Sequence, residues 1–278
     1  MTIKYSMKIT IIADNYVDTA SLVAEHGFSC LIEVYGTKIL FDTGQGQALL
    51  NNMKQLDIPK ELDMLVFSHG HYDHTGGLDR YFDELSDYCS EIYASSYLFD
   101  KHLKKSGDIY SYIGIEKTQD EIEEAFTLYM NDDLVEISDN IFLSGPIKRY
   151  EEFNADKLLC AHVDGEYGKD IFRDEQYLVI RTEDGLHVVT GCTHCGAVNL
   201  LKDVRVKFPD DKLLSVTGGL HMFRSEPWQT DHVIEFLETE SVQSINTGHC
   251  TGLDAAMQMK QKLGDRVQIT KAGMIIQL

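Results

Sequence analysis

The sequence lacks any long hydrophobic run. No stretch approaches the about 20 consecutive apolar residues that a membrane-spanning helix needs, so we expect no membrane partner. The first residues, MTIKYSMKITIIAD, alternate polar and apolar side chains as a strand does. They lack the long apolar centre and the small-residue cleavage site of a secretory signal peptide. We therefore expect a cytoplasmic protein.

Basic residues are scarce. The chain has 25 Lys and Arg against 45 Asp and Glu, which gives a formal net charge of -20. The only basic clusters are residues 101–105 (KHLKK) and 147–150 (IKRY), and both are short. A chain this acidic repels a polyphosphate backbone, so we expect no long nucleic acid as a partner. A small anionic substrate is compatible with this charge if bound cations supply a local positive field.

Few residues mark a domain boundary or a disulfide framework. The 278 residues include only 4 prolines and no Ser/Gly-rich linker, repeat or low-complexity tract, so we treat residues 1–278 as a single domain. The 6 cysteines are scattered through a chain that is long enough to fold without staples, and we expect reduced thiols. The sequence does not decide the oligomeric state, and a homo-oligomer is compatible with it.

Short β-branched runs alternate with helical patterns in both halves of the chain. We predict strands at residues 8–14, 29–35, 37–44, 63–69, 176–182, 186–194, 212–221, 242–250, 266–270 and 274–278. We predict helices at residues 47–56, 230–239 and 253–263, with Thr43 as the cap of the first. This alternation indicates an α/β protein in which helices are layered on sheets.

The middle of the chain, at about residues 82–160, has a different composition. It is rich in Tyr, Asp and Glu, and residues 119–129 (QDEIEEAFTLY) have helical periodicity. We interpret this segment as an insertion or lid beside the site, a usual role of a long segment next to a cleft. The alternative is plain scaffold.

Four side chains able to bind metal crowd into one turn, SHGHYDHTGG at residues 68–77. His69 and His71 end a predicted strand and point to the same side, because strand side chains repeat every two residues. Two imidazoles so placed can hold one borderline metal ion such as zinc. Asp73 and His74, beyond the turn, can face a second ion. The glycines of the run allow the backbone to turn tightly.

Three further histidines each follow an apolar run and a glycine: His194 in VVTGCTH, His221 in VTGGLH and His249 in INTGH. We predict His194 and His249 as metal ligands, and His221 as either a ligand or a hydrogen-bonded structural residue. Ligating histidines need an acceptor for the other ring nitrogen, and Asp42 at the end of KILFD is our candidate. Its alternative role is that of a helix cap or turn former.

Cys192 and Cys195 form a C-x-x-C pair around His194. Alone, this pair is compatible with half a zinc ribbon or with a redox pair. The sequence has no second C-x-x-C, so we interpret both thiols as packing residues beside His194. Cys250, next to His249, receives the same interpretation, with metal contact as the alternative.

The run SHGHYDHTGG resembles the metal-binding signature of the metallo-β-lactamase superfamily, and the later strand-end donors follow the order of that superfamily. The resemblance covers nearly the whole chain. It implies an α/β fold of four layers, an αββα sandwich, with a dinuclear metal site along one edge of the two sheets. It also implies two sets of ligands: His69, His71 and His194 for the first ion, and Asp73, His74 and His249 for the second.

Further phrases are similar to proteins grouped with the archaeal methanopterin-pathway synthase: AEHGFSCLIEVYGTKILFDTG, FRDEQYLVIRT, GCTHCGAVNL, VTGGLHM and TGHCTG. That enzyme joins a dihydropterin diphosphate to ribofuranosylaminobenzene phosphate, whereas many members of the group are known only as metal-dependent hydrolases. One position departs from the superfamily. Many members have an aspartate that bridges both ions where this chain reads VTGGLHM, with His221 nearest. Either His221 contributes there or the second ion is held more weakly.

These residues and the resemblance predict a metal-dependent hydrolase. A hydroxide held by two divalent ions would attack a small anionic phosphoester or diphosphate. Zinc is the first expectation for the ions, with manganese or iron as alternatives. Asp73 would orient the hydroxide, and His221 would donate a proton to the leaving group or hold a substrate oxygen. Tyr72 would line the substrate pocket.

Three alternatives stay open. The first is a transferase that joins a dihydropterin diphosphate to an aminobenzene ribose phosphate. The second is an iron-dependent redox enzyme. The third is a non-catalytic module that binds a ligand or stores metal. An open dinuclear site is a poor structural staple, because structural zinc sites are closed, and this argument favours an enzyme.

Overall fold

Two seven-stranded sheets form the body of the computed structural model, which describes residues 7–153, 158–163 and 166–278. The strands of the first sheet are β1 (Lys8–Ala13), β2 (Ser29–Val34), β3 (Thr37–Phe41), β4 (Met64–Val66), β5 (Glu91–Ser95), β8 (Thr127–Asn131) and β18 (Ile275–Gln277). Those of the second are β9 (Val135–Ser138), β10 (Ile141–Leu143), β13 (Tyr177–Arg181), β14 (Leu186–Thr190), β15 (Leu213–Gly218), β16 (Ser244–Thr247) and β17 (Val267–Ile269). Their spatial orders are β18-β1-β2-β3-β4-β5-β8 and β17-β16-β15-β14-β13-β10-β9.

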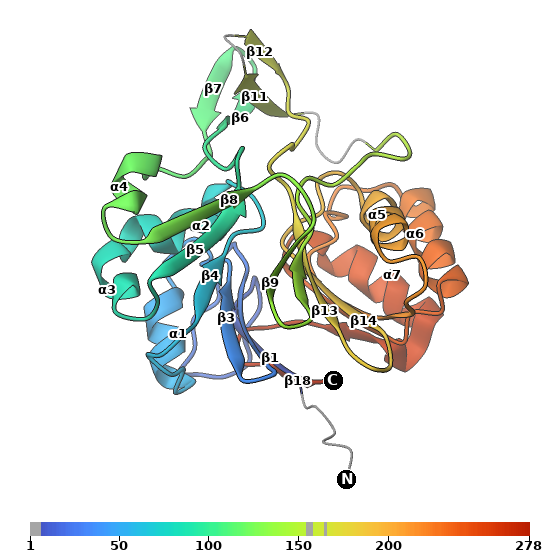
Figure 1. The fold of residues 1–278 in the computed structure, drawn as a ribbon. Helices are drawn as coiled ribbons and strands as arrows, with labels where there is room; N and C mark the ends of the chain where they lie inside the picture. The colour runs from blue at the N-terminus through green and yellow to red at the C-terminus, as the bar shows by residue number, and fades with distance from the viewer. Residues whose placement is uncertain (1–6, 154–157, 164–165) are drawn as a thin grey trace.

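Helices cover the outer face of each sheet (Figure 1). Those beside the first sheet are α1 (Leu49–Gln55), α2 (Tyr72–Arg80), α3 (Phe82–Ser86) and α4 (Gln119–Glu123). Those beside the second are α5 (Ala197–Lys207), α6 (Pro227–Thr239) and α7 (Leu253–Leu263), with the short 3-10 helices η1 (His249–Thr251) and η2 (Gly264–Arg266). Across the described residues, every helix falls short of the length and apolarity needed to cross a membrane.

Three clusters of buried side chains match the three interfaces between these layers. The central cluster joins side chains of both sheets, for example Ile9 and Val66 of the first to Leu178 and Val189 of the second. Sheets covered on both faces need apolar residues at nearly every position, and all five side chains of β14 are buried. The α/β class and the four-layer αββα sandwich expected from the resemblance are therefore confirmed.

Parallel pairing brings several strand ends to one edge of each sheet. In the first sheet β3, β4, β5 and β8 are parallel neighbours, and in the second β14, β15, β16 and β17 are. The carboxyl ends of parallel neighbours lie at the same edge, where ligands of open α/β sheets usually bind. The loops that follow β3, β4, β14, β15 and β16 carry the predicted site residues.

A separate four-stranded sheet projects from the sandwich (Figure 1). It consists of β6 (Lys101–Ser106), β7 (Ile109–Tyr112), β11 (Leu159–Val163) and β12 (Glu166–Lys169), in the order β12-β11-β6-β7. Within the segment 82–160, β5, β8, β9 and β10 instead belong to the two main sheets. Residues 154–157 of that segment lie outside the described residues. Of the described residues within the segment 82–160, only β6, β7 and the first residues of β11 thus belong to the projecting sheet, and the lid stays a prediction.

One predicted helix is shorter than its periodicity suggested. Of residues 119–129, only Gln119–Glu123 are helical, and the chain then enters β8 at Thr127. Leu128 pairs with Ile92 of β5, so a place in the main sheet overrides the local helical pattern.

The prediction of Thr43 as a helix cap is wrong. The hydroxyl of Thr43 donates to the carbonyl oxygen of His74 at 2.8 Å. The carboxylate of Glu25 instead accepts four backbone N–H groups ahead of α1, from residues 45, 46, 47 and 48 at 2.6–3.2 Å. Glu25, which lies 20 positions before Gln45, thus has the capping role that was predicted for Thr43.

Candidate functional site

The histidine-rich turn lies between β4 and α2. The predicted strand 63–69 ends at Val66, so a turn, and not strand alternation, brings His69 and His71 together. His71 is the N-cap residue of α2 and has extended dihedrals, φ -70° and ψ 144°. Asp73 and His74 lie in the first turn of that helix and are both buried.

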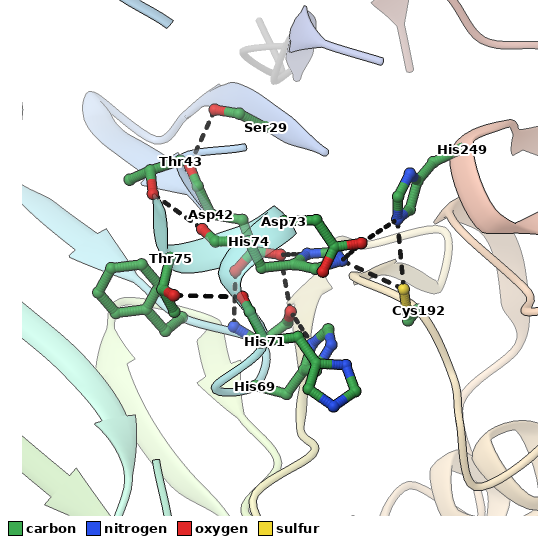
Figure 2. Close-up of polar contacts among 12 residues, drawn as sticks. Ser29, Asp42, Thr43, His69, His71, Asp73, His74, Thr75, Cys192 and His249 are labelled. Atoms are coloured by element: carbon green, nitrogen blue, oxygen red, sulfur yellow. Dashed lines mark hydrogen bonds and ion pairs between the residues drawn. The ribbon is translucent and has the colours of Figure 1, made fainter. Parts of the chain in front are cut away.

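His69, His71 and His194 form the first cluster (Figure 2 shows the first two). The ring centroids lie 4.7 Å apart for His69 and His71, 4.7 Å for His71 and His194, and 5.0 Å for His69 and His194. The Nε2 atoms of His69 and His194 face one another at 3.3 Å. All three residues are at least 96% buried.

Burial favours the neutral form of these three imidazole rings. Burial is the largest cause that lowers the pKa of each ring: to about 4 for His71, and well below the ordinary value for His69 and His194. A neutral imidazole offers a lone pair, which is the form that binds a metal ion. The Nε2 atom of His71 has no hydrogen-bond partner among the described residues. Three converging lone pairs, one of them unsatisfied, fit a bound cation.

Asp73, His74, Cys192 and His249 form the second cluster (Figure 2). The Sγ atom of Cys192 lies 3.1 Å from Nε2 of His74 and 3.4 Å from Nε2 of His249. Oδ2 of Asp73 lies 3.5 Å from Nε2 of His249 and 4.0 Å from Nε2 of His74. The sequence analysis interpreted Cys192 as a packing residue, whereas the structure places its sulfur in this cluster. The C-x-x-C motif was the sequence signal that could have identified it.

Opposite charges meet in the second cluster. Burial alone would lower the pKa of His74, but the charges of Asp42 and Asp73 outweigh it and raise the pKa above its ordinary value. Burial would raise the pKa of Asp73, yet His74 and a hydrogen bond from His249 hold it well below its usual range. The pocket between these groups thus favours a positive charge next to the Asp73 carboxylate.

Asp42 connects the two clusters. Its Oδ2 atom lies 2.7 Å from Nδ1 of His74 and accepts the Ser68 hydroxyl at 2.7 Å. The same hydroxyl lies 2.9 Å from Nδ1 of His69. Asp42 is fully buried and also accepts the backbone N–H of Ser68 at 2.7 Å. Asp42 therefore lies where we expected an acceptor for the ring nitrogens that face away from the clusters, here Nδ1 of His74 and, through Ser68, Nδ1 of His69.

Glu175 holds the loop that carries His194, and the sequence prediction did not include it. Its carboxylate accepts the backbone N–H of His194 at 2.5 Å and that of Cys195 at 2.8 Å. Burial raises the pKa of Glu175 to about 7. No pattern in the sequence separates this residue from other acidic residues that precede a strand.

His221 lies beside both clusters. Its ring centroid is 4.1 Å from that of His194, and it forms a further group with Cys192 and Cys250. Neither of its ring nitrogens has a hydrogen-bond partner among the described residues, although the residue is 94% buried. Burial is the largest cause that lowers its pKa to about 3. His221 is therefore not the satisfied structural histidine of the alternative interpretation.

Three site residues adopt backbone conformations that non-glycine residues rarely take. Asp42, His221 and His249 have φ values of 56°, 46° and 42°. The left-handed region costs a non-glycine residue about 1–2 kcal/mol. Such strain concentrates at functional sites, where the surrounding contacts hold it in place.

A cavity of about 110 Å³ opens beside the clusters. Its lining includes Tyr72, His26, Lys104, Phe223 and Arg224, together with ring atoms of the clusters. Nε2 of His26 lies 3.3 Å from Oδ2 of Asp73. We expected Tyr72 at the pocket, but the sequence analysis did not predict His26, Lys104, Phe223 or Arg224 there. Two cationic side chains and two aromatic rings border one small cavity beside the buried imidazoles.

A buried histidine joins the small sheet to the site. Nδ1 of His102, in β6, lies 2.7 Å from Asp170, and its Nε2 lies 3.2 Å from Asp174. Burial would lower the pKa of His102, but Asp174 and Asp170 raise it to about 10. The ring of His102 lies 4.9 Å from that of His71, and Asp174 accepts the backbone N–H of Gly70 at 2.7 Å. The small sheet is thus fixed to the turn that carries the first cluster.

An αββα sandwich with buried histidine clusters at one edge of its sheets defines a metallo-β-lactamase-type protein. The family model of the metallo-β-lactamase superfamily matches residues 23–104. The chain is 32% identical over 284 residues to 7,8-dihydropterin-6-methyl-4-(β-D-ribofuranosyl)-aminobenzene-5'-phosphate synthase of Methanocaldococcus jannaschii, covering 98% of this chain and 96% of that protein. The chain therefore belongs to the metallo-β-lactamase superfamily.

Solved structures agree with this assignment. The crystal structure of Tm1679, described as a metal-dependent hydrolase of the β-lactamase superfamily, has a TM-score of 0.85 and 29% identity. That similarity covers 98% of this chain and 99% of Tm1679. A diphosphatase of the PhnP family has a TM-score of 0.52 and 14% identity, with coverage of 98% and 97%, and shares the fold.

Proposed function

We propose that the protein is a metal-dependent enzyme that joins a dihydropterin diphosphate to an aminobenzene ribose phosphate. The observation that carries this proposal is the 32% identity, over 98% of the chain, to a synthase whose name describes such a product. The comparison thus favours the transferase over the hydrolase that the sequence alone predicted.

In this proposal, His69, His71 and His194 hold one divalent ion, and Asp73, His74 and His249 contribute to a second. The supporting observations are the three neutral imidazoles of the first cluster and the buried carboxylate of the second. Divalent ions at these positions would neutralise the charge of a diphosphate and make it a better leaving group. Zinc suits nitrogen-rich sites of this kind, with manganese or iron as alternatives.

Residues on the cavity wall fit an anionic substrate that carries a ring. Lys104 and Arg224 can bind phosphate oxygens, because cationic side chains form charge-assisted hydrogen bonds with phosphate. Phe223 and Tyr72 can pack against a pterin or aminobenzene ring. His221, buried and without a hydrogen-bond partner among the described residues, can accept a hydrogen bond from the acceptor amine and orient it.

The covalent step is a substitution at carbon. The acceptor nitrogen forms a bond to the methylene carbon of the pterin, the bond from that carbon to the diphosphate oxygen breaks, and diphosphate leaves with the electron pair. The departing diphosphate takes up the nitrogen proton. Held side by side at the site, the two substrates react without the entropic cost of a free encounter.

The test uses purified protein whose metal content has been measured. It is incubated with a hydroxymethyl-dihydropterin diphosphate and ribofuranosylaminobenzene phosphate. We expect a coupled product, together with loss of activity and of metal from the first site in His71→Ala. Free hydroxymethylpterin without coupling would contradict the transferase proposal.

Lys104→Ala tests the placement of the substrate. We expect a KM for the diphosphate that rises about 10- to 150-fold, because a charge-assisted hydrogen bond contributes about 1.5–3 kcal/mol. The matched control is Lys105→Ala, the next residue of β6, whose ammonium lies over the ring of Tyr110. An equal effect of both variants would remove Lys104 from the substrate site.

A second candidate is a hydrolase of a small phosphoester or diphosphate, which the similarity to Tm1679 favours. Water would then attack phosphorus, the P–O bond to the leaving group would break, and an alcohol or a phosphate would leave. A screen of phosphomonoesters and phosphodiesters separates this candidate from the transferase. The cytoplasmic location and the exclusion of long nucleic acids stay predictions.

A further inference from the structure

We propose that the thiolate of Cys192 is a fourth ligand of the second metal ion. The sequence lacks a bridging aspartate between the third and last histidines, and VTGGLHM occupies that place. The second site would otherwise have only Asp73, His74 and His249. Cys192 comes from a different loop, the one that follows β14. This inference rests on the proposed metal centre and adds a ligand to it.

Four distances among the ligand atoms lie near the edges of a tetrahedral zinc site, two of them within the expected range. Zinc binds imidazole nitrogen at about 2.0–2.1 Å and thiolate sulfur at about 2.3 Å, which puts the edges of a tetrahedron at about 3.3–3.6 Å. The edges from Sγ of Cys192 to the imidazoles of His74 and His249 are 3.1 Å and 3.4 Å. The edges from Asp73 to the same nitrogens are 4.0 Å and 3.5 Å.

The backbone aims this sulfur at the cluster. The Cys192 carbonyl accepts the hydroxyl of Thr193 at 2.6 Å and the thiol of Cys250 at 3.4 Å, so the residue is fixed through its main chain. Cys192 is 98% buried, and Figure 2 shows its sulfur directed at the imidazole of His249. A packing cysteine would have apolar neighbours, and this one faces two imidazole nitrogens.

The other thiols nearby provide a contrast. The Sγ atom of Cys195 points to the carbonyl oxygen of Gly196 at 3.7 Å, and that of Cys250 points to the carbonyl oxygen of Cys192. Cys250 also lies close to Cys192 and His221, in a group without a carboxylate. Only Cys192, among the described cysteines, belongs to the group that contains Asp73.

A thiolate ligand has consequences for the metal. Coordination releases the thiol proton to solvent, so binding of the second ion is coupled to proton release. Soft thiolate ligands favour zinc over hard ions such as manganese. The second site is therefore zinc-selective, whereas the all-histidine first site discriminates less.

Cobalt(II) provides a test that does not depend on activity. The metal-free protein is titrated with cobalt(II), and the near-ultraviolet absorption from thiolate-to-cobalt charge transfer is recorded. We expect this band in the wild-type protein and in Cys195→Ser. We expect Cys192→Ser to lose the band and to bind its second cobalt ion at least tenfold more weakly, while Cys250→Ser keeps the band.

Each other result has a definite reading. If the wild-type protein binds no cobalt or zinc, the proposed metal centre itself is wrong. If it binds two cobalt ions without the charge-transfer band, Cys192 is not a ligand and the metal centre stands. A band that persists in Cys192→Ser but disappears in Cys250→Ser would transfer the role to Cys250. Even where a variant does not fold, the wild-type spectrum decides whether any thiolate binds the metal, since absence of the band overturns the proposal.

Discussion

One carboxylate orients a ring in each histidine cluster. Asp42 contacts His74 directly and reaches His69 through the hydroxyl of Ser68. Acceptors in this position fix the tautomer of a ligating histidine and increase its basicity. Because Asp42 serves both rings, the two proposed metal sites depend on one side chain.

Asp42→Asn should therefore weaken metal binding about 10–100-fold while the fold survives. Asparagine tolerates the positive φ of 56° at this position, but its amide lacks the negative charge that both rings use. Competition with a chelator of known affinity measures the effect. Asp63→Asn is the control, since its Oδ2 accepts only the backbone N–H of Lys38 at 2.7 Å, in an exposed position. Equal affinities in the two variants would contradict the role of Asp42.

The sequence predicts the histidines better than the cysteine. Each predicted histidine follows a strand of a parallel set, and parallel strands deliver their ends to one edge, so strand-end histidines converge. Cys192 and Cys195 flank Thr193 and His194 in the sequence. The positive φ of 61° at Thr193 turns the loop, and their sulfurs then point to His74 and to the Gly196 carbonyl. The C-x-x-C spacing alone does not show that the two sulfurs point in different directions.

At the scale of elements, the segment before α1 depends on a distant carboxylate. Glu25 accepts four backbone N–H groups that no α1 side chain satisfies, and Ala48 at the N-cap offers no acceptor. Carboxylates at a helix N-terminus also interact favourably with its dipole. This contact joins the loop after β1 to the loop that carries Asp42.

Glu25→Gln should lower the free energy of unfolding by about 1–3 kcal/mol, because hydrogen bonds to a charged group are stronger than those to a neutral amide. Urea denaturation followed by circular dichroism measures the change. Glu61→Gln, at an exposed position, is the control and should change stability by less than about 0.5 kcal/mol. A loss of the same size in both variants would show that Glu25 does not cap this segment.

Element boundaries follow tertiary contacts that a single sequence does not contain. Strands 8–14, 29–35 and 176–182 were predicted because their apolar runs are local signals, and β1, β2 and β13 match them closely. The helix α5 (Ala197–Lys207) and the small sheet were not predicted. Four of the six residues of β6 and all four of β7 are exposed, so these strands carry no apolar pattern that the sequence could reveal.

At the scale of the whole molecule, the four layers follow from the resemblance and not from periodicity alone. Local patterns indicate α/β, but they do not distinguish one doubly covered sheet from two sheets packed face to face. The central cluster of Ile9, Val66, Leu178 and Val189 has members in each sheet, and only the folded chain brings them together.

The proposed metal centre lies between the two halves of the sandwich. His69, His71, Asp73 and His74 follow β4 of the first sheet, whereas His194 and His249 follow β14 and β16 of the second. Ions bound at the proposed centre would hold both sheet edges, and the unfolded chain cannot assemble these ligands. Linkage then stabilises the folded state by about 4 kcal/mol when free metal exceeds its Kd a thousandfold.

Removal of metal should therefore lower the Tm, by about 5–15 °C for a chain of this size. Calorimetry compares two samples. One is protein that has been treated with a chelator and then dialysed, and the other is the same protein after it has been reloaded with zinc. The control is His71→Ala, in which reloading should restore only part of the shift, since the first cluster has lost a ligand. If zinc restored the full Tm shift in His71→Ala, the stabilising ion would be bound elsewhere in the chain. If the Tm of the wild-type protein did not change, metal binding at these histidines would not contribute to stability.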